Sequence, residues 1–432
     1  MQARGFITPK ILTSNSPATK AFESVDGKFI KSQNTPQHVT PIGRVLSDQQ
    51  RAALSKVIDN KTICVIMGSA GTGKSEVLAS AYEALGDRCM VITPTHKTKL
   101  ALQEKGVEKV NLIRGLLKNK AVQQQLFDNR VTHILVDEAG MVDRSTQVQL
   151  ESFIANGPNH SISVTYFGDP NQLEAISDNA VELENIWFDK VTPDFVLTTG
   201  YRQDANVILS VVKDTKINPN SVTICMTNDT RNDVNLLAHI SKHGSKAFTS
   251  RKKAILEIHV GDTLICYETD SHQKYANNCV YTVRKVKHGH IDEKGKIAER
   301  GKDCFMVWFE GSRQCVIIEK SMFRVANHKT DEKRAWEFSY AITCHAAQGS
   351  GFDDVTVYVE SNRVWDVDGN VSIHYGLKDT NIQKWIYTAI TRGKKKITVV
   401  DSEGAIDADG ISLSMEILQS FGMHLPTFKD AA

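Results

Sequence analysis

Between residues 46 and 200 the chain alternates short, wholly apolar runs with longer segments of helical periodicity. Runs that are apolar on both faces are typical of strands in a parallel sheet that is covered by helices on both sides. Such sheets bind their ligands at the carboxyl ends of the strands. Four runs are predicted as strands, with a helix beginning near Lys74 after the first: TICVIM (62–67), CMVIT (89–93), HILVDE (133–138) and SVTYFGD (163–169).

The same alternation restarts after residue 200 and is interrupted once. A strand at 222–227 and a helix at 228–240 are predicted first. Residues 255–325 then hold short β-type runs joined by turns, a pattern typical of a small β-barrel. The pattern therefore predicts two α/β domains, with a β-barrel inserted in the second. Later elements of the second domain are predicted at 338–345, 355–360 and 396–402 as strands and around 381–391 as a helix.

The ends of the chain differ from this body. Residues 1–45 hold four of the ten prolines and six basic against two acidic residues, which predicts a flexible basic arm. Pro9 and Pro17 would break the amphipathic helix of a mitochondrial transit peptide, so no targeting segment is expected. The predicted domains are the arm 1–45, a first domain 46–200 with a short insert near 105–130, a second domain 201–254 and 327–410, the barrel 255–326 and a tail 411–432.

Composition and charge narrow the class of protein. The 432 residues are 41% hydrophobic and 24% charged, which is ordinary for a globular protein. No apolar run approaches the roughly 18 residues of a membrane span, so no membrane association is expected. The net charge of +2 does not indicate a nucleic-acid binder, so any such site must be a local groove. Eight scattered cysteines without a C-x-x-C pair predict reduced, structural thiols and a cytoplasmic protein, in the host cytoplasm if viral.

A phosphate-binding loop is the strongest chemical signal. The segment GSAGTGKS, Gly68–Ser75, follows a predicted strand and opens a predicted helix, as this motif requires. Gly71 and Gly73 allow backbone amides to close around phosphates. Lys74 then reaches the β- and γ-phosphates of ATP, and the Ser75 hydroxyl binds Mg²⁺.

Polar residues after two other strands complete a nucleotide-hydrolysis site. In VDEAG, Asp137 suits the water shell of Mg²⁺, and Glu138 suits either the base for the attacking water or the residue that orients it. In FGDPNQL, Gln172 is placed to sense the γ-phosphate or the water. Surface acids at strand ends are common, but an acidic pair about sixty residues after a phosphate loop is a strong signal.

Phosphoryl transfer needs more positive charge than one lysine supplies. An arginine that acts at the transition state contributes about 10³–10⁵ in rate. Two candidates lie in the second predicted domain: Arg202 in GYRQ and Arg392 in YTAITRGKKK. If both reach the phosphate loop, the nucleotide binds between the two α/β domains. Closing the cleft would then complete the site, and hydrolysis would open it.

Taken together, these motifs resemble those of superfamily 1 helicases, in the RecD/Dda-like branch (superfamily 1B) that includes the Pif-type enzymes. The resemblance runs from Leu46 to about residue 402 and implies two RecA-like parallel-sheet motor domains with an SH3-like β-barrel inserted in the second. The segments that carry it are LSDQQRAAL (46–54), GSAGTGKS (68–75), TPTHKTKL (93–100), VDEAG (136–140), GDPNQL (168–173), LTTGYRQ (197–203), YAITCHAAQGSGFDDV (340–355) and IYTAITRGKKKI (386–397).

The resemblance also implies roles for individual residues, with ATP and Mg²⁺ as cofactors. The implied catalytic residues are Lys74, Asp137, Glu138, Gln172, Arg202 and Arg392. The implied nucleotide-binding residues are Gln50 at the adenine, Gly68, Ala70, Gly71, Thr72, Gly73, Lys74, Ser75 and Gly349, with Ser75 and Asp137 at the metal. The implied DNA-binding residues are Thr93, Pro94, Thr95, His96, Lys97, Thr343 and His345.

The implied function is that of an ATP-dependent 5′-to-3′ DNA helicase in replication, recombination or repair. It would act as a monomer on single strands and on junctions of single- and double-stranded DNA, with single-strand-binding or replication proteins as candidate partners. One alternative is a single-strand translocase that displaces bound proteins, because relatives place a duplex-splitting β-hairpin where this chain has only KNKAVQQQLFDNR, residues 118–130. A nucleotide-gated binding protein without turnover, and RNA as the track, also stay open.

Overall fold

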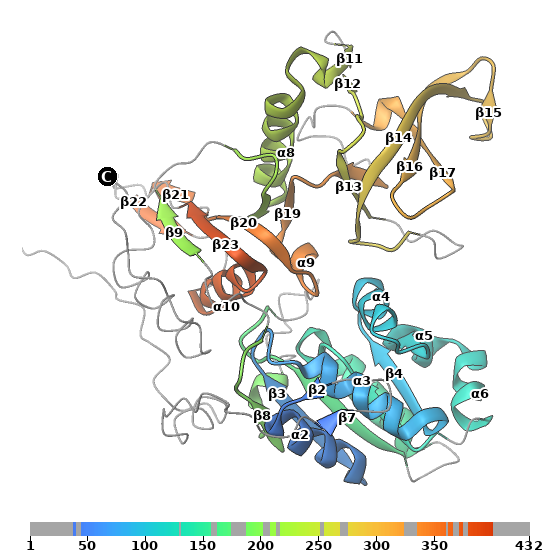
Figure 1. Ribbon diagram of the computed structural model, residues 1–432, viewed down its shortest axis with the longest axis vertical. Helices are drawn as coiled ribbons and strands as arrows, with labels where there is room; N and C mark the ends of the chain where they lie inside the picture. The colour runs from blue at the N-terminus through green and yellow to red at the C-terminus, as the bar shows by residue number, and fades with distance from the viewer. Residues whose placement is uncertain are drawn as a thin grey trace, which may run out of the picture. The chain divides into compact units, whose positions relative to one another are not determined.

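The computed structural model describes thirteen stretches of the chain, and they fall into two compact units (Figure 1). Unit 1 takes in residues 1–205, 375–388 and 414–424, and unit 2 takes in residues 206–374, 389–413 and 425–432. Nearly all of the predicted arm and the whole of the predicted tail lie outside the described residues. The described residues are 38–39, 45–128, 131–156, 162–173, 187–201, 208–212, 217–250, 255–267, 275–323, 335–359, 362–365, 371–374 and 379–400.

Unit 1 is built on a six-stranded sheet with the order β5-β4-β6-β7-β3-β8, in which every neighbouring pair is parallel. The four strands predicted from apolar runs are present, displaced by at most a few residues at their ends. The polar residues of those runs lie just after the strands, at one edge of the sheet. The bounds are β3 Ile63–Gly68, β4 Cys89–Thr93, β5 Val110–Leu112, β6 His133–Val136, β7 Ser163–Gly168 and β8 Phe195–Leu197.

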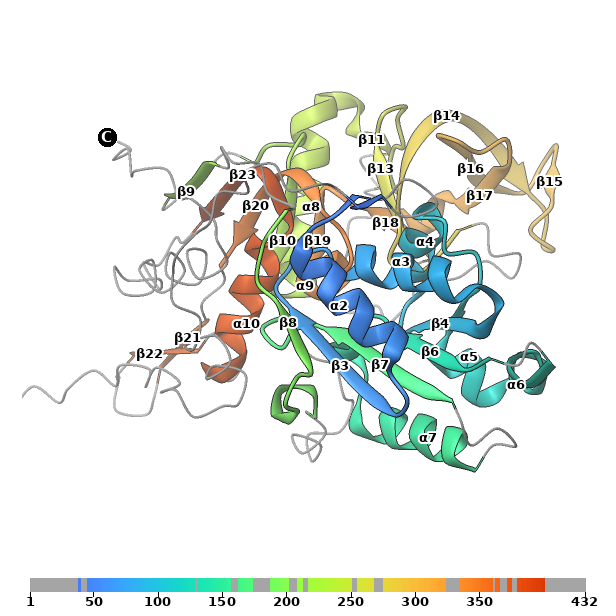
Figure 2. The same cartoon turned by 60° about the horizontal axis from the view of Figure 1, so that its bottom comes forward.

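Helices cover both faces of this sheet, as Figure 2 shows for α2 and α7. Along β3, Cys64 and Ile66 pack in the core with α2, α3 and α4, whereas Val65 and Met67 pack in the core with α5, α6 and α7. Each such apolar side chain contributes about 1.5–3 kcal/mol when it is fully buried. The helices are α2 Asp48–Asp59, α3 Lys74–Leu85, α4 His96–Glu104, α5 Ile113–Lys118, α6 Lys120–Asp128 and α7 Arg144–Ala155.

The segment in which the sequence lacked the expected duplex-splitting hairpin, residues 118–130, is helical over its described part. Residues 113–128 form α5 and α6, which pack through Leu116 and Leu126 into the core of unit 1. Within this described stretch no residue is in a strand. The sequence showed no strand signal between residues 117 and 131, and the helices agree with that.

Unit 2 contains a second parallel sheet, of five strands in the order β19-β10-β20-β23-β9. The two parallel sheets with their helices confirm the predicted fold class of two RecA-like α/β domains. The elements are β9 Ile208–Val212, β10 Val222–Cys225, α8 Asn228–His243, β19 Ala341–Thr343, α9 Cys344–Ala347, β20 Phe352–Tyr358 and β23 Gly393–Val400. Helix α10, Asp379–Ile390, precedes β23 in the chain, and its residues up to Thr388 group with unit 1.

An antiparallel sheet lies in unit 2 between α8 and β19 in the sequence, with the order β17-β16-β14-β13-β18 and β15 paired to β14. Its aromatic core includes Phe305, Phe309 and Trp336. Closure of these strands into an SH3-like barrel stays a prediction. The bounds are β13 Thr263–Cys266, β14 Val280–Ile291, β15 Ile297–Ala298, β16 Lys302–Phe309, β17 Cys315–Glu319 and β18 Trp336–Phe338.

The run predicted as one strand at 338–345 is divided between two sheets. Phe338 ends β18 of the antiparallel sheet, and β19 of the parallel sheet begins at Ala341. The remaining short elements are β1 His38–Val39, β2 Val45–Leu46, β11 Phe248–Ser250, β12 Ile255–Leu256, β21 Asn362–Trp365, β22 Val371–His374, and the 3-10 helices η1 Gly86–Arg88, η2 Ala139–Met141, η4 Phe188–Lys190, η5 Gly244–Ala247 and η6 Lys320–Met322.

Two further expectations from the sequence concern the thiols and membrane-spanning helices. All eight cysteines are free thiols, and six of them are buried. Burial raises the pKa of the Cys89 and Cys344 thiols to about 12, which agrees with structural rather than reactive roles. Among the helices of the described residues, none has the length and apolar character that a membrane span requires.

Candidate functional site

The carboxyl ends of four neighbouring strands in unit 1 collect the polar residues that the sequence singled out. The phosphate loop follows β3, Asp169 follows β7, Asp137 follows β6, and Thr93 ends β4. Because β4, β6, β7 and β3 are consecutive in the sheet, these groups share one edge. This edge is the ligand-binding edge of open parallel sheets.

The phosphate loop wraps around its own lysine. Gly71 and Gly73 both have φ of +85°, in the left-handed region that glycine adopts without strain. The Lys74 ammonium is buried and donates hydrogen bonds to the carbonyl oxygens of Gly68, at 2.6 Å, and Ser69, at 3.0 Å. Among the described residues the buried Ser69 hydroxyl has no hydrogen-bond partner. The loop therefore holds a positive charge and an unsatisfied polar group at the sheet edge.

Gln50 joins the start of α2 to this loop. Its side-chain oxygen accepts a hydrogen bond from the Ser47 backbone N–H at 3.0 Å, and the Ser47 hydroxyl accepts one from the Gln50 N–H. This reciprocal pair is a capping box, which fixes the first turn of the helix. The Gln50 amide nitrogen donates to the Thr72 carbonyl at 3.2 Å. Gln50 therefore supports the loop directly, while its contact with adenine stays a prediction.

The two acidic residues after β6 differ in their surroundings. Asp137 is buried, and burial together with the neighbouring Glu138 charge raises the pKa of its carboxyl to about 7, against the opposing effect of Lys74. A nearby cation would stabilise the ionised form of this buried carboxyl. Glu138 is partly exposed and has φ of +50°, an uncommon conformation for a residue with a side chain. Strained backbone of this kind gathers at functional sites.

Asp169 anchors a buried hydrogen-bond network that the sequence analysis missed. The Gln172 amide nitrogen donates to its carboxylate at 3.0 Å, and the Tyr387 hydroxyl donates to the same oxygen at 2.8 Å. The Tyr387 hydroxyl also accepts the backbone N–H of Ala70 at 3.0 Å. Tyr387 belongs to residues 375–388, which group with unit 1 by their contacts. The network therefore connects the phosphate loop to the segment that carries Gln172.

Signals for this network were present in the sequence but were not used. Asp169 ends the apolar run SVTYFGD, in the same position that Asp137 holds after its own strand. Tyr387 and Thr388 lie in IYTAITRGKKKI, residues 386–397, the segment in which the sequence pointed to Arg392 alone. Thr388 accepts the Leu173 backbone N–H at 2.9 Å, so two consecutive side chains of α10 hold the loop after β7. Leu173 and Thr388 are 215 positions apart, so their contact cannot be predicted from the spacing of residues in the sequence.

The predicted DNA-binding residues of unit 1 stand at the start of α4. Thr95 caps the helix, and its hydroxyl accepts the Thr98 backbone N–H at 3.2 Å. Thr93 is fully buried, with its hydroxyl against that of Thr98. Pro94, His96 and Lys97 are partly exposed, and burial lowers the pKa of His96. His96 is therefore a neutral ring at neutral pH.

The predicted residues of unit 2 surround α9. Thr343 caps this short helix by accepting the Ala346 N–H at 3.4 Å, and His345 is partly exposed with its pKa lowered by burial. Gly349 follows with φ of +74°. Arg392 is buried, and its guanidinium donates to the Ser350 carbonyl at 3.3 Å and to the Thr391 hydroxyl at 3.1 Å. The roles assigned to these residues stay predictions.

Arg202 lies outside the described residues. Its immediate predecessor in the sequence, Tyr201, donates its backbone N–H to the Gly71 carbonyl at 2.8 Å. The segment LTTGY that leads to Arg202 therefore ends against the phosphate loop.

Comparison with known proteins gives relatives for most of the chain. Residues 45–233 match the AAA domain family. The conjugal transfer protein TraA of Rhizobium radiobacter is 23% identical over 412 residues, covering 83% of this chain and 35% of TraA. A probable TraA of Sinorhizobium fredii is 22% identical and covers 88% of this chain. The chain thus spans about a third of the length of the curated relatives it matches.

Solved structures share the fold of the chain. The structure of two coordinating Pif1 helicases that unwind DNA at forked double-stranded DNA has a TM-score of 0.54, with 15% identity, and covers 89% of this chain and 100% of that one. The Pif1 helicase from Bacteroides in complex with ADP-AlF3 and single-stranded DNA has a TM-score of 0.53, with 16% identity and the same coverage. These likenesses show that the chain shares the fold of these helicase structures, as the sequence motifs predicted.

Proposed function

We propose that this chain is an ATP-dependent DNA helicase that moves 5′ to 3′ along single-stranded DNA. The support is the resemblance of its sequence motifs to superfamily 1B helicases of the Pif-type branch, together with the fold that it shares with Pif1 structures. The proposal also covers its substrates, which are single strands and junctions of single- and double-stranded DNA. Its direction rests on the resemblance alone. Single-strand-binding or replication proteins are the partners it would meet there, and it would act as a monomer.

The observation that carries this proposal is the charge arrangement at the sheet edge of unit 1. A buried ammonium, that of Lys74, and a buried carboxyl whose pKa is raised to about 7, that of Asp137, occur together with the unsatisfied Ser69 hydroxyl. Groups of this kind are costly to bury unless a ligand compensates them. A phosphate with its magnesium ion supplies a negative charge for Lys74 and a positive one for Asp137, so the residues fit MgATP.

Each side chain then has a defined task. Lys74 would bind oxygens of the β- and γ-phosphates, while Ser75 and Asp137 would hold Mg²⁺, which neutralises charge on the phosphates when bound. Glu138 would accept a proton from the attacking water, and Gln172, held by Asp169, would orient that water. Arg202 and Arg392 would stabilise the charge of the transition state, a contribution of about 10³–10⁵ in rate.

The DNA track would run over α4 and α9. Hydroxyl groups and backbone amides bind phosphates without reading the base sequence, and a base stacked on a ring contributes about 1–3 kcal/mol. Neutral rings suit such stacking, and the lowered pKa values of His96 and His345 support it. A track of this kind, with little net charge, allows a motor to release and rebind the strand.

ATP hydrolysis stimulated by single-stranded DNA tests the enzymatic part of the proposal. The purified chain should hydrolyse ATP faster with single-stranded DNA than without, and Lys74→Ala should abolish both rates. Lys109→Ala is the matched control, because that lysine pairs with Asp87 on the surface of the same unit. A DNA-stimulated rate that persists in Lys74→Ala would overturn the proposal. Equal stimulation by matched RNA would remove its restriction to DNA.

A second candidate function follows from the helices α5 and α6. Because residues 113–128 contain no strand in this described stretch, the chain could move on single strands and displace proteins while separating duplexes poorly. Tailed duplexes distinguish the two functions. Rapid unwinding of a long duplex with a 5′ tail supports the helicase and excludes this alternative. Unwinding only from a 3′ tail contradicts the proposed direction.

A further inference from the structure

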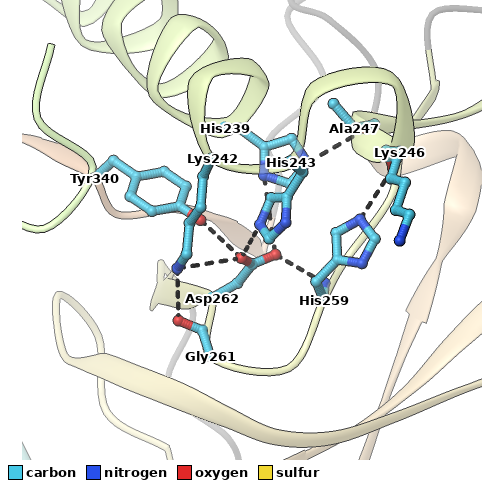
Figure 3. Close-up of polar contacts among 9 residues, drawn as sticks. All are labelled: His239, Lys242, His243, Lys246, Ala247, His259, Gly261, Asp262 and Tyr340. Carbon is cyan, nitrogen blue, oxygen red and sulfur yellow. Dashed lines mark hydrogen bonds and ion pairs between the residues drawn. The ribbon is translucent and has the colours of Figure 1, made fainter.

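Two histidines and an aspartate that the proposed function does not use converge in unit 2 (Figure 3). His239 and His243 lie four residues apart on α8, which puts them on the same face of the helix. Asp262 comes from the turn that precedes β13. The side chains of His239 and Asp262 have no exposed surface, and that of His243 is 14% exposed. The cluster is therefore almost fully enclosed, with His243 nearest to solvent.

The three side chains present their ligand atoms to one another. The His243 Nε2 atom lies 2.7 Å from Asp262 Oδ1, in a hydrogen bond that it donates to the carboxylate and whose proton a bound ion would replace. The His239 Nδ1 atom lies 3.9 Å from Asp262 Oδ2. All of the ligand atoms lie within 4.8 Å of each other. In a tetrahedral zinc site with bonds of about 2.0–2.1 Å, neighbouring ligand atoms are about 3.3 Å apart. The observed separations fall on either side of that value.

The hydrogen bonds of His239 leave the atom that faces the carboxylate with an unused electron pair. Its Nε2 lies 3.3 Å from the Ala247 carbonyl oxygen, which can only accept, so Nε2 carries the proton. In the neutral imidazole the other ring nitrogen, Nδ1, then has no proton and is an acceptor. Among the described residues this buried Nδ1 has no hydrogen-bond partner. Two electron-pair acceptors therefore face each other in a fully buried place, an arrangement that a cation between them would satisfy.

The neighbouring groups orient these side chains in the way that metal sites require. A ligating histidine usually donates its other ring N–H to a backbone carbonyl, as His239 does to Ala247. Ligating carboxylates are held by hydrogen bonds in turn. Asp262 Oδ2 accepts the His259 backbone N–H at 2.8 Å, and Oδ1 accepts the Tyr340 hydroxyl at 2.7 Å.

We propose that His239 Nδ1, His243 Nε2 and the Asp262 carboxylate bind one divalent transition-metal ion of the Zn²⁺ class. Two imidazoles and a carboxylate form a ligand set that suits zinc, with a fourth position for water. The ion would link helix α8 to the turn that leads into the antiparallel sheet. Its role would be to stabilise unit 2, and it is independent of the proposed helicase activity.

Lys242 would compete with a metal ion for the Asp262 carboxylate, and this competition provides a second variant for the test. The Lys242 ammonium lies 3.7 Å from Asp262 Oδ1 and donates to the Gly261 carbonyl at 2.9 Å. Its positive charge competes with a cation for the same carboxylate. The lysine side chain is 27% exposed, so it can turn toward solvent when an ion binds. Replacing it with an uncharged residue should therefore strengthen metal binding.

Metal titration of the full chain tests the proposal. The chelator-treated protein is titrated with Zn²⁺ by calorimetry and with Co²⁺ by visible absorption. We expect one ion per chain, at least tenfold weaker binding in His243→Gln and severalfold tighter binding in Lys242→Met. His288→Gln is the matched control, because this histidine of β14 is 55% exposed and lies outside the cluster, and its affinity should not change.

The results distinguish metal binding by the histidine cluster from metal binding by the eight cysteine thiols. Zn²⁺ should also raise the melting temperature of the protein, and this rise should be lost in His243→Gln. If His243→Gln does not fold, two measurements still test the proposal. The Co²⁺ spectrum shows whether cysteines bind the ion, because cobalt bound to cysteine absorbs as a thiolate complex, and Lys242→Met shows whether the ion lies beside Asp262. Absence of stoichiometric binding, a thiolate spectrum, or unchanged affinity in both Lys242→Met and His243→Gln would overturn the proposal.

Discussion

The hydroxyl of Tyr387 is the atom whose removal tests the phosphate-loop network most sharply. It donates to the buried Asp169 carboxylate at 2.8 Å and accepts the Ala70 backbone N–H at 3.0 Å. Tyr387→Phe keeps the ring and deletes both bonds. It leaves a buried carboxylate with one donor fewer, and the loop without its link to the segment after β7.

The expected cost follows from the charge of the acceptor. A hydrogen bond to an ionised group contributes about 1.5–3 kcal/mol, roughly twice the value of a neutral one. Tyr387→Phe should therefore destabilise unit 1 by about 2–3 kcal/mol. For a domain of this size each kcal/mol lowers the melting temperature by about 2–4 °C, so we expect a drop of roughly 5–10 °C.

Tyr82→Phe provides the matched control. The Tyr82 hydroxyl also accepts a backbone N–H, that of Lys109 at 3.2 Å, but at an exposed place in the same unit where water can replace it. Its loss should shift the melting temperature by no more than about 2 °C. Thermal unfolding followed by circular dichroism measures both variants. Equal melting temperatures for Tyr387→Phe and Tyr82→Phe would refute the reasoning.

A double-mutant cycle then isolates the bond itself. Asp169→Asn removes the charge, so adding Tyr387→Phe to it should cost less than in the wild type, by about 1 kcal/mol or more. Strict additivity of the two changes would show that the hydroxyl stabilises the protein through some other contact.

Two further predictions concern the loop and the thiols. A Cβ on Gly73, where φ is +85°, would lie 2.1 Å from the Gln50 amide nitrogen, whereas a Cβ on Gly86, at φ of +55°, would meet nothing within 4 Å. Gly73→Ala should thus weaken nucleotide binding in a fluorescent-nucleotide titration, because Gln50 must move away from the loop. Gly86→Ala should only lower stability, by about 1–3 kcal/mol; similar binding by both variants would contradict this. A thiol reagent at neutral pH should label Cys279, which is partly exposed, well before Cys344, whose burial raises its pKa to about 12. Mass spectrometry of the labelled peptides measures the order, and faster labelling of Cys344 would show that this core opens readily.

The first parallel sheet could be predicted largely because its strands lie in mostly apolar runs. A buried parallel strand such as β4, at 89–93, stands out from its neighbours, and its predicted bounds are those observed. The run 338–345 was harder, because its residues are divided between two sheets and the start of α9. Its composition does not mark where the chain leaves one sheet for the other.

The candidate site was predictable where its residues are close in sequence. The phosphate loop and the acids after β6 carry local patterns whose chemistry is known. The bond between Tyr387 and Asp169 joins residues 218 positions apart, so only the tertiary structure brings them together. The histidine cluster combines both cases, since the spacing of His239 and His243 is visible in the sequence but their approach to Asp262 is not.

Movement along single-stranded DNA is the measurement that tests the central claim most directly. Oligonucleotides that carry biotin at one end are loaded with streptavidin, and its ATP-dependent release is followed over time. The proposed motor should displace streptavidin from the 3′ end and leave it at the 5′ end, and Lys74→Ala should displace it from neither. Release from the 5′ end alone, or release that continues in Lys74→Ala, would contradict an ATP-driven motor that moves 5′ to 3′.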